Sequence, residues 1–399
     1  MSMVVPHRIV VAPSGFKESL DAEAVAAAIA AGVHRALPGC IVDEVPLVDG
    51  GEGSARTLAA ATGGRIVEVR VTGPVGAPVD SHIALLGGDS TGTAVVEMAA
   101  AAGLSLVPRD QRDPGATTSY GVGELILAAL DEGAERVLVG CGDSGTCDGG
   151  AGALQALGAQ VRDRAGAEVG RGGTALADVD SLDLRGLDPR LAGLEIRVAC
   201  NPHNVLTGPK GVARVFGPQK GATPEQVEVL DAAMARWAEV LRRDAAVHLA
   251  VLGLDVATGM GTGASGGLGA GLAAGLGARL LPRFDVLLDH VDLDGLLAAA
   301  DLVITAEGAV DFQTPHGKIP AEVARRAKQR GKPVLALAGS IGRGADDVYD
   351  VGIDAFASIM AVPMPLEQAV EEGARLLCDA AERAMRLVLL GSSISASAR

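Results

Sequence analysis

One segment of the sequence, residues 305–318, contains two carboxylates, an amide and a lysine close together. The carboxylates are Glu307 and Asp311, and they are followed by Gln313 and Lys318. Carboxylates can hold a divalent cation and a lysine can neutralise phosphate charge, and phosphoryl transfer requires both. We therefore predict that residues 305–318 form part of a site for phosphoryl transfer.

A second segment, residues 140–150, contains five glycines. Because glycine has no Cβ, the backbone N–H groups of such a loop can approach a phosphate closely, and a helix is expected to begin near Ala151. We predict that this loop cradles the phosphates of a nucleotide. The predicted nucleotide contacts are Gly142, Ser144, Gly145, Asp148, Gly149 and Gly150.

Two shorter loops also contain charged residues suited to ligand binding. Residues 13–19 include Lys17 ahead of a predicted helix, whose N-terminus favours an anion. Residues 48–54 place Asp49 and Glu52 among three glycines. Each loop is equally consistent with a solvated turn, so the sequence alone leaves the role of both open.

Two other glycine motifs indicate different chemistry. Residues 263–267 match G-x-S-x-G, the pattern of a serine nucleophile, but no convincing strand precedes them. Residues 261–266 match G-x-G-x-x-G with Asp285 about twenty residues later, as in dinucleotide-binding enzymes. The motif G-x-x-x-x-G-K-[ST] does not occur, which excludes an ordinary P-loop kinase. A serine hydrolase is disfavoured, and an NAD(P)-dependent oxidoreductase stays as an alternative.

The elements that must position these loops are visible in the hydrophobic pattern. Short β-branched runs alternate with alanine-rich segments of helical period, which predicts an α/β fold with a mainly parallel sheet. Residues 8–12 are expected to form a strand, residues 21–37 a helix, and a capping box at Thr223 predicts a helix to Leu241. In open parallel sheets, ligands bind beyond the carboxyl ends of the strands. Further strands are predicted at residues 41–47, 66–71, 94–98, 137–140, 196–200, 302–306, 334–338 and 356–361.

Two segments have no clear period. Residues 259–281 are rich in Gly, Ala and Leu, and their pattern does not decide between a helix and a loop. The tail at residues 392–399 is expected to be disordered.

Composition favours a protein that acts on small metabolites. The chain has 399 residues and a net charge of −15, so phosphate backbones and anionic membranes should repel it. Only 2% of the residues are aromatic, which leaves few stacking surfaces for nucleic acid. The five cysteines show no C-x-x-C spacing, and neither a signal peptide nor a long apolar segment is found. We expect a cytoplasmic protein with no nucleic-acid or membrane partner.

Eight longer motifs occur in order along the chain. They are SGFKESL (14–20), VDGGEGS (48–54), VTGPVG (71–76), TTSYGVGELI (117–126), DGGAGALQALG (148–158), LTGPKGVARVFGPQKGAT (206–223), GTGASGGLGAGL (261–272) and EGAVDFQTPHGK (307–318). This set resembles the bacterial type 1 glycerate kinase family over nearly the whole chain. The resemblance implies an ATP-dependent and Mg²⁺-dependent kinase that phosphorylates a hydroxyl of D-glycerate to give 2-phosphoglycerate.

The resemblance also implies a fold of two α/β domains. A flavodoxin-like parallel-sheet domain, residues 1–70 and 285–399, would be interrupted by a second α/β domain, residues 71–284. The active site would lie in the cleft between them. A homodimer is kept among the expected assemblies.

Roles can be assigned to the residues that match the family motifs. Phosphoryl transfer usually needs a carboxylate to receive the hydroxyl proton, and we predict Asp311 as this base or as a metal-holding carboxylate, with Glu307 as its partner. Lys318 and Lys17 are predicted to clamp a phosphate or a carboxylate. The predicted Mg²⁺ ligands are Asp49, Glu52 and Asp311. The predicted acceptor contacts are Ser14, Lys17, Ser119, Asn201, His203 and Gln313.

The sequence departs from the family pattern in two places. Residues 142–150 are GDSGTCDGG where the family usually has a sequence close to GGSATNDGG, so Cys147 replaces an asparagine. Residues 200–209 are CNPHNVLTGP where the family usually has close to CDVDNPLTGP, so Asn201 and His203 replace two carboxylates. A different small hydroxylated acceptor, a greater need for Mg²⁺, and drift without functional effect all stay open. A non-catalytic metabolite-binding protein is a further alternative.

Overall fold

The chain forms two units, each with its own sheet. The computed structural model describes residues 5–16, 19–288 and 292–397. The two units are Met1–Asp49 together with Val291–Arg399, and Gly50–His290. A discontinuous first unit with a second unit inserted into it is therefore present.

The bounds of the units differ from the predicted 70 and 285. Helix α2 (Ser54–Thr62) packs on strands β3 (Arg65–Thr72) and β4 (Pro78–Leu85), and β3 pairs with β4 along its whole length. Residues 50–70 consequently belong to the inserted unit, because their packing and pairing partners lie there.

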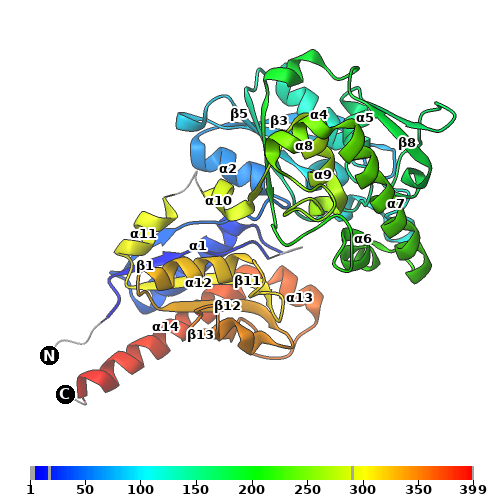
Figure 1. Ribbon diagram of the computed structural model, residues 1–399. Coiled ribbons are helices and arrows are strands. Elements are labelled where there is room, and N and C mark those ends of the chain that lie inside the picture. The colour runs from blue at the N-terminus through cyan, green and yellow to red at the C-terminus, as the bar shows by residue number, and fades with distance from the viewer. Residues whose placement is uncertain (1–4, 17–18, 289–291, 398–399) are drawn as a thin grey trace. The chain divides into compact units, whose positions relative to one another are not determined.

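The first unit contains a five-stranded sheet in which all pairs are parallel (Figure 1). Its strands are β1 (Arg8–Val11), β2 (Ile41–Glu44), β11 (Leu302–Val310), β12 (Val334–Ile341) and β13 (Ala355–Ser358). Across the sheet the order is β13, β12, β11, β1, β2. If the five strands of this unit are numbered in chain order, the order read from β2 to β13 is 2-1-3-4-5. This is the order of the flavodoxin-like fold that we predicted.

Helices cover the first sheet. Helix α1 (Ala22–Ala36) begins after Asp21, whose side chain accepts a hydrogen bond from Ala24 N at 2.7 Å. It packs against α14 (Gly373–Ser397), and both bury apolar side chains such as Ile29 against the sheet. The other helices of this unit are α11 (Leu293–Ala299), α12 (Ile319–Gln329), α13 (Leu366–Glu371) and the 3₁₀ turn Ala345–Tyr349.

The predicted disorder of residues 392–399 is wrong for the described part of that tail. Helix α14 continues to Ser397. Ser392 Oγ donates to Val388 O at 3.1 Å and Ser393 Oγ donates to Leu390 O at 2.8 Å, so these serines bond to their own helix. Residues 398–399 lie outside the described part of the chain.

The inserted unit contains a six-stranded mixed sheet. Its strands are β3, β4, β5 (Thr93–Glu97), β6 (Arg136–Gly140), β9 (Glu195–Cys200) and β10 (Arg279–Pro282). The order is β10, β9, β6, β5, β4, β3, with parallel pairs from β10 to β5 and antiparallel pairs from β5 to β3. A separate antiparallel pair is formed by β7 (Gln160–Asp163) and β8 (Val179–Asp183).

The helices of the inserted unit include the one predicted from its capping box. Thr223 Oγ1 accepts from Gln226 N, Gln226 Oε1 accepts from Thr223 N, and the helix α7 (Pro224–Asp244) follows. The remaining helices are α2, α3 (Met98–Ala102), α4 (Tyr120–Asp131), α5 (Ala151–Ala156), α6 (Val212–Phe216), α8 (Ala246–Leu252), α9 (Ala264–Leu276) and α10 (Arg283–Leu287). No helix in the described residues is both long enough and apolar enough to cross a membrane.

Residues 259–281, whose pattern did not decide between a helix and a loop, contain a buried helix in which residues 265–267 depart from helical backbone angles. Helix α9 occupies the centre of this segment, and residues 264–275 of this helix are all buried. A helix that is apolar on every side has no amphipathic period, so its sequence lacks the spacing of apolar and polar residues that identifies a helix.

Candidate functional site

The first sheet has a switch point between β1 and β11, because the chain leaves β1 toward β2 and leaves β11 toward β12 on the opposite side. Ligands of such sheets bind beyond the carboxyl ends of the strands at this point. Ser14 follows β1, and its backbone N and its Oγ donate to Ala306 O at 2.9 and 3.0 Å. The predicted site residues Ser14 and Glu307 therefore both lie where β1 and β11 adjoin.

A lysine lies between two carboxylates at this position. Lys318, the residue that precedes α12, places its Nζ 3.1 Å from Glu307 Oε1 and 3.7 Å from Asp311 Oδ1. The same Nζ is 3.4 Å from Ala309 O. Glu307 Oε2 is buried and has no hydrogen-bond partner among the described residues. The structure thus brings Glu307, Asp311 and Lys318 together, as predicted, and leaves one buried carboxylate oxygen of Glu307 without a hydrogen-bond partner among the described residues.

The surroundings of Glu307 change its acidity. Burial raises the pKa of Glu307 to about 7, Lys318 opposes this rise, and the negative charges of Asp49 and Asp311 add to it. Burial disfavours the charged form of a carboxyl group because water no longer solvates it. A carboxyl group with a pKa near neutrality can accept a proton and release it again at physiological pH.

Asp311 has a different local role. Its Oδ1 accepts from Gln313 N at 2.9 Å, while its backbone N donates to Thr314 Oγ1 at 3.1 Å. These bonds close a turn at the end of β11. The side chain of Gln313 is exposed beside this turn.

The other residues predicted to bind Mg²⁺ or a phosphate, Asp49, Lys17 and Glu52, do not all belong to the same unit. Asp49 ends the segment after β2, and its charge contributes to the raised pKa of Glu307. Lys17 lies outside the described residues. Glu52 belongs to the inserted unit, is exposed, and its backbone N donates to Asp143 Oδ2 at 3.3 Å. Within the described residues, no group of three or more His, Cys, Asp or Glu side chains is arranged to hold a metal ion.

In the inserted unit, the second half of the glycine-rich loop after β6 is packed into the interior. Asp148 is fully buried, and its Oδ2 accepts from Ser119 N at 2.7 Å and from Ser119 Oγ at 2.9 Å. Gly149 O accepts from Trp237 Nε1 at 2.9 Å, and Gly150 N donates to Asp148 Oδ1 at 3.2 Å. These contacts hold the loop to α4, α5 and α7. That Ser119, Asp148, Gly149 and Gly150 contact a ligand stays a prediction.

The packing of Gly149 gives a stability prediction. Gly149 has a φ of +62°, and a Cβ there would lie 2.4 Å from Trp237 Cδ1, whereas Gly63 has a φ of +67° and open space around it. Gly149→Ala is expected to lower the free energy of unfolding by roughly 2–4 kcal/mol, because overpacking adds to the left-handed strain, and Gly63→Ala by only about 1 kcal/mol. Denaturant unfolding of both variants measures the difference, and equal losses would contradict the packing argument.

The first half of the same loop is less enclosed and includes a contact that the sequence analysis missed. Asp143 has a φ of +51°, and a Cβ on Gly142 would lie 2.5 Å from Gly51 Cα. Ser144, which follows, is half-buried, and its Oγ accepts a hydrogen bond from Lys220 Nζ at 2.8 Å. Lys220 occurs in the motif of residues 206–223, between Gln219 and Gly221. A lysine is ordinarily exposed, so only its position inside a long motif could have indicated a role.

Asn201 and His203 follow β9 in the inserted unit. Asn201 Oδ1 accepts from His203 N at 3.0 Å, which closes a local turn, and the His203 side chain is exposed. The turn adjoins the glycine motif of residues 261–267, since Gly261 N donates to Pro202 O at 3.2 Å. Nothing in these contacts assigns the acceptor to either residue, so both stay predictions.

The two competing glycine motifs lack the structural setting that their chemistry requires. Residues 261–266 follow α8 and a turn instead of a strand, so the strand–loop–helix unit of a dinucleotide site is missing there. Ser265 has a φ of +51°, but the side chain that interacts with its hydroxyl is the Cys141 thiol, which is not a general base. The structure supports neither an oxidoreductase nor a serine hydrolase at these residues.

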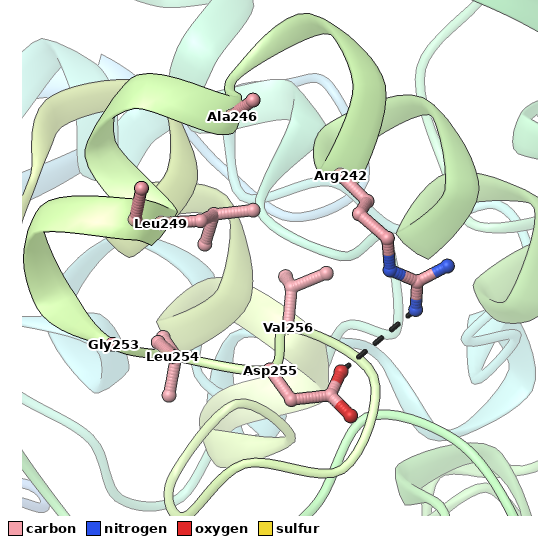
Figure 2. A pocket seen from close by; sticks show the side chains of 8 residues that line it. Arg242, Ala246, Leu249, Gly253, Leu254, Asp255 and Val256 are labelled. Carbon is pink, nitrogen blue, oxygen red and sulfur yellow. Dashed lines mark ion pairs between the residues drawn. The ribbon is translucent and has the colours of Figure 1, made fainter.

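Two surface pockets of the inserted unit contain none of the predicted site residues. Figure 2 shows one lined by residues of α7 and α8 and of the segment after α8, where Arg242 and Asp255 form an ion pair of 3.8 Å and apolar side chains such as Leu249 and Val256 complete the lining. A second pocket is lined by Asp113, Gly115, Ala116, Thr174, Glu225, Gln226 and Val229. In the first pocket, hydrogen bonds from Ala257 and Thr258 lower the pKa of Asp255, so this carboxylate stays ionised, whereas burial raises the pKa of Glu307 at the β1–β11 position.

Sequence families and solved structures resemble this chain over nearly its full length. A sequence model of the Glycerate kinase family matches residues 9–389. Glycerate kinase of Bacillus subtilis is 47% identical over 370 residues, covering 93% of this chain and 94% of that protein. Glycerate 2-kinase of Escherichia coli is 42% identical over 384 residues, covering 96% and 98%.

A solved structure shares both fold and sequence with this chain. It is the crystal structure of a glycerate kinase 2 candidate from Salmonella typhimurium LT2, with a TM-score of 0.77 and 44% sequence identity. The match covers 96% of this chain and 98% of that one.

Proposed function

This chain belongs to the glycerate kinase family, and we propose that it transfers the terminal phosphoryl group of ATP to the 2-hydroxyl of D-glycerate. It is a kinase with a hydroxyl acceptor, and its family implies ATP as the phosphate donor. The choice of acceptor follows the names of its relatives, and the choice of hydroxyl follows the name of the Escherichia coli protein.

The observation that supports this proposal is the arrangement of Lys318 between Glu307 and Asp311 at the switch point of the first sheet. In the reaction, the acceptor oxygen forms a bond to the terminal phosphorus, the bond from that phosphorus to the bridging oxygen breaks, and ADP leaves. The hydroxyl proton must pass to a base. A cation beside that base can neutralise charge on the transferred group, and we propose Lys318 for this role.

We assign the base to Glu307 instead of Asp311, which was the first choice from the sequence. Glu307 Oε2 has no partner among the described residues, and burial raises the pKa of this carboxyl group to about 7. Asp311 uses its carboxylate to close a turn. A base must have a lone pair free and an acidity near the working pH, and Glu307 meets both conditions.

Mg²⁺ fits the residues around Glu307. Asp49 and Asp311 both act on Glu307 through their charge, and Asp311 also lies 3.7 Å from Lys318. Mg²⁺ in kinases is usually held by one or two carboxylates together with substrate phosphates, so a complete protein cage is not required. We propose Asp49 and Asp311 as its ligands. When bound, Mg²⁺ would neutralise charge on the ATP phosphates.

A panel of acceptors tests the proposed function. With Mg-ATP, D-glycerate is expected to release ADP with a kcat/KM above roughly 10⁴ M⁻¹s⁻¹ and to exceed other 2- and 3-hydroxy acids and small polyols. Analysis of the product should show 2-phosphoglycerate. A clear preference for another acceptor would indicate that the replacement of two family carboxylates by Asn201 and His203 changes the acceptor. The kinase proposal fails if NADH raises the melting temperature of the protein and Mg-ATP does not.

A further inference from the structure

A buried lysine lies beneath the glycine-rich loop of the inserted unit. Lys220 ends the 3₁₀ turn Pro218–Lys220 and is only 3% exposed. Its Nζ donates to Ser144 Oγ at 2.8 Å and to Thr146 O at 2.7 Å. An ammonium group has three N–H donors, so one of them has no partner among the described residues.

The charge of Lys220 has no carboxylate directly opposite it. Within the described residues it takes part in no ion pair, and the acidic groups whose charge acts on it are Cys147 and Asp148 of the glycine-rich loop. Asp148 already accepts three hydrogen bonds from Ser119 and Gly150. A buried ammonium group without a directly paired carboxylate is costly, and a ligand that supplies a negative oxygen would reduce that cost.

The bond from Lys220 fixes the role of the Ser144 hydroxyl. Because the Lys220 ammonium donates to Ser144 Oγ, the hydrogen of the Ser144 hydroxyl must point away from Lys220. This hydrogen has no acceptor among the described residues. Ser144 is half-buried, so a ligand can reach it, whereas Lys220 lies behind it. Ser144 is therefore a donor whose strength is increased by the positive charge behind it.

One further hydroxyl without a partner lies in the same loop. Thr146 Oγ1 is buried, its residue is 0% exposed, and it has no hydrogen-bond partner in the described residues. The backbone oxygen of the same residue, Thr146 O, accepts a hydrogen bond from Lys220 Nζ. An unused hydroxyl donor thus belongs to the residue whose carbonyl binds the buried lysine.

We propose that Ser144 and Lys220 form an oxyanion site in the inserted unit, in which the Ser144 hydroxyl donates to a phosphate or carboxylate oxygen of a substrate. Lys220 is a positioning residue that acts through Ser144 and supplies the positive charge. The proposal rests on the proposed function, because ATP offers phosphate oxygens and D-glycerate offers a carboxylate. An oxygen of either group could accept the hydrogen bond for which the Ser144 hydroxyl has no acceptor among the described residues.

Direct binding measurements test the site without relying on turnover. We would measure the Kd of the Mg²⁺ complex of β,γ-imido-ATP and, separately, of D-glycerate for wild type, Lys220→Met and Ser144→Ala by calorimetry. Lys210→Met, which removes an exposed lysine from the same motif of residues 206–223, is the matched control. The Kd of one of the two ligands is expected to rise at least tenfold in Lys220→Met and Ser144→Ala and to stay unchanged in Lys210→Met.

The affected ligand identifies the source of the oxyanion. A loss confined to β,γ-imido-ATP assigns the site to a phosphate, and a loss confined to D-glycerate assigns it to the carboxylate. If both constants stay within twofold of wild type in the two variants, the oxyanion site is wrong even when the enzyme is an active glycerate kinase. If Lys220→Met does not fold, Ser144→Ala alone decides between these outcomes, because it keeps the bond from Lys220 to Thr146 O.

Proton uptake separates this role from a purely structural one. Burial lowers the pKa of Lys220 to about 8, while Cys147 and Asp148 oppose that fall. Asp231 of α7 acts on Cys147, and Arg214 of α6 is paired with that aspartate. Near pH 8.5 an arriving oxyanion should restore the lysine proton, so calorimetry in two buffers should show proton uptake in wild type and none in Lys220→Met. Equal uptake in both proteins would overturn the role of Lys220.

Discussion

Replacing Glu307 with glutamine is expected to lower kcat by a factor on the order of 10² or more while the protein stays folded. Glutamine has nearly the same shape but cannot accept the hydroxyl proton, and it keeps an oxygen for Lys318, which is 3.1 Å from Glu307 Oε1. Steady-state kinetics with Mg-ATP and D-glycerate measures the loss. Glu367→Gln, an exposed glutamate at the start of α13, is the matched control and should leave kcat unchanged.

The dependence on pH gives the Glu307 assignment a second readout. Burial raises the pKa of this carboxyl group from 4.5 to about 7, so the reactive carboxylate forms as the pH rises through neutrality. Below pH 7, kcat/KM should therefore increase about tenfold per pH unit and then level off. Glu307→Gln should lose this rise. A variant with near-normal kcat and an unchanged profile would contradict the assignment and return the base to Asp311.

The same pKa shift has a consequence for stability. Between pH 4.5 and about 7 the folded protein holds a proton on Glu307 that the unfolded chain has lost, so ionising this group weakens folding as the pH rises through that window. Glu307→Gln has no such group. Its free energy of unfolding relative to wild type should therefore increase from pH 5 to pH 7.5.

The elements that could be predicted from the sequence are those with a local signal. The capping box at Thr223 gave the start of α7, and β-branched runs between glycines gave strands such as β6 and β11. Two features depend on long-range packing and were not predictable. The chain passes to the inserted unit after Asp49, because α2 and β3 pack with β4, and residues 392–397 continue the long helix α14.

The site shows the same division between local and long-range information. Spacing alone indicated that Glu307, Asp311 and Lys318 lie together, because all three belong to one strand end and the loop that follows it. It could not rank the two carboxylates, since their difference comes from burial and from the charge of Asp49, far away in the sequence. The bond from Lys220 to Ser144 joins residues 76 positions apart and has no local signal.

Lys318→Met is expected to have the other large effect, a fall in kcat/KM by a factor on the order of 10³. The methionine fills the space of the lysine stem but leaves Glu307 and Asp311 facing each other without the cation that now lies 3.1 and 3.7 Å from them. In the proposed mechanism, both the transferred phosphoryl group and the ionised base then lose the positive charge of Lys318.

The same variant, Lys318→Met, should also shift the pH profile of kcat/KM to higher pH. Lys318 lowers the pKa of Glu307, while Asp49 and Asp311 raise it, so removal of the lysine leaves only influences that favour the protonated acid. The midpoint of kcat/KM should therefore shift above 7. Lys318→Arg, which keeps the charge but not the compact ammonium, should hold the midpoint near that of wild type even if turnover falls. A Lys318→Met enzyme whose midpoint stays in place would show that Glu307 is not the group that titrates, and an unchanged kcat/KM would remove Lys318 from the site.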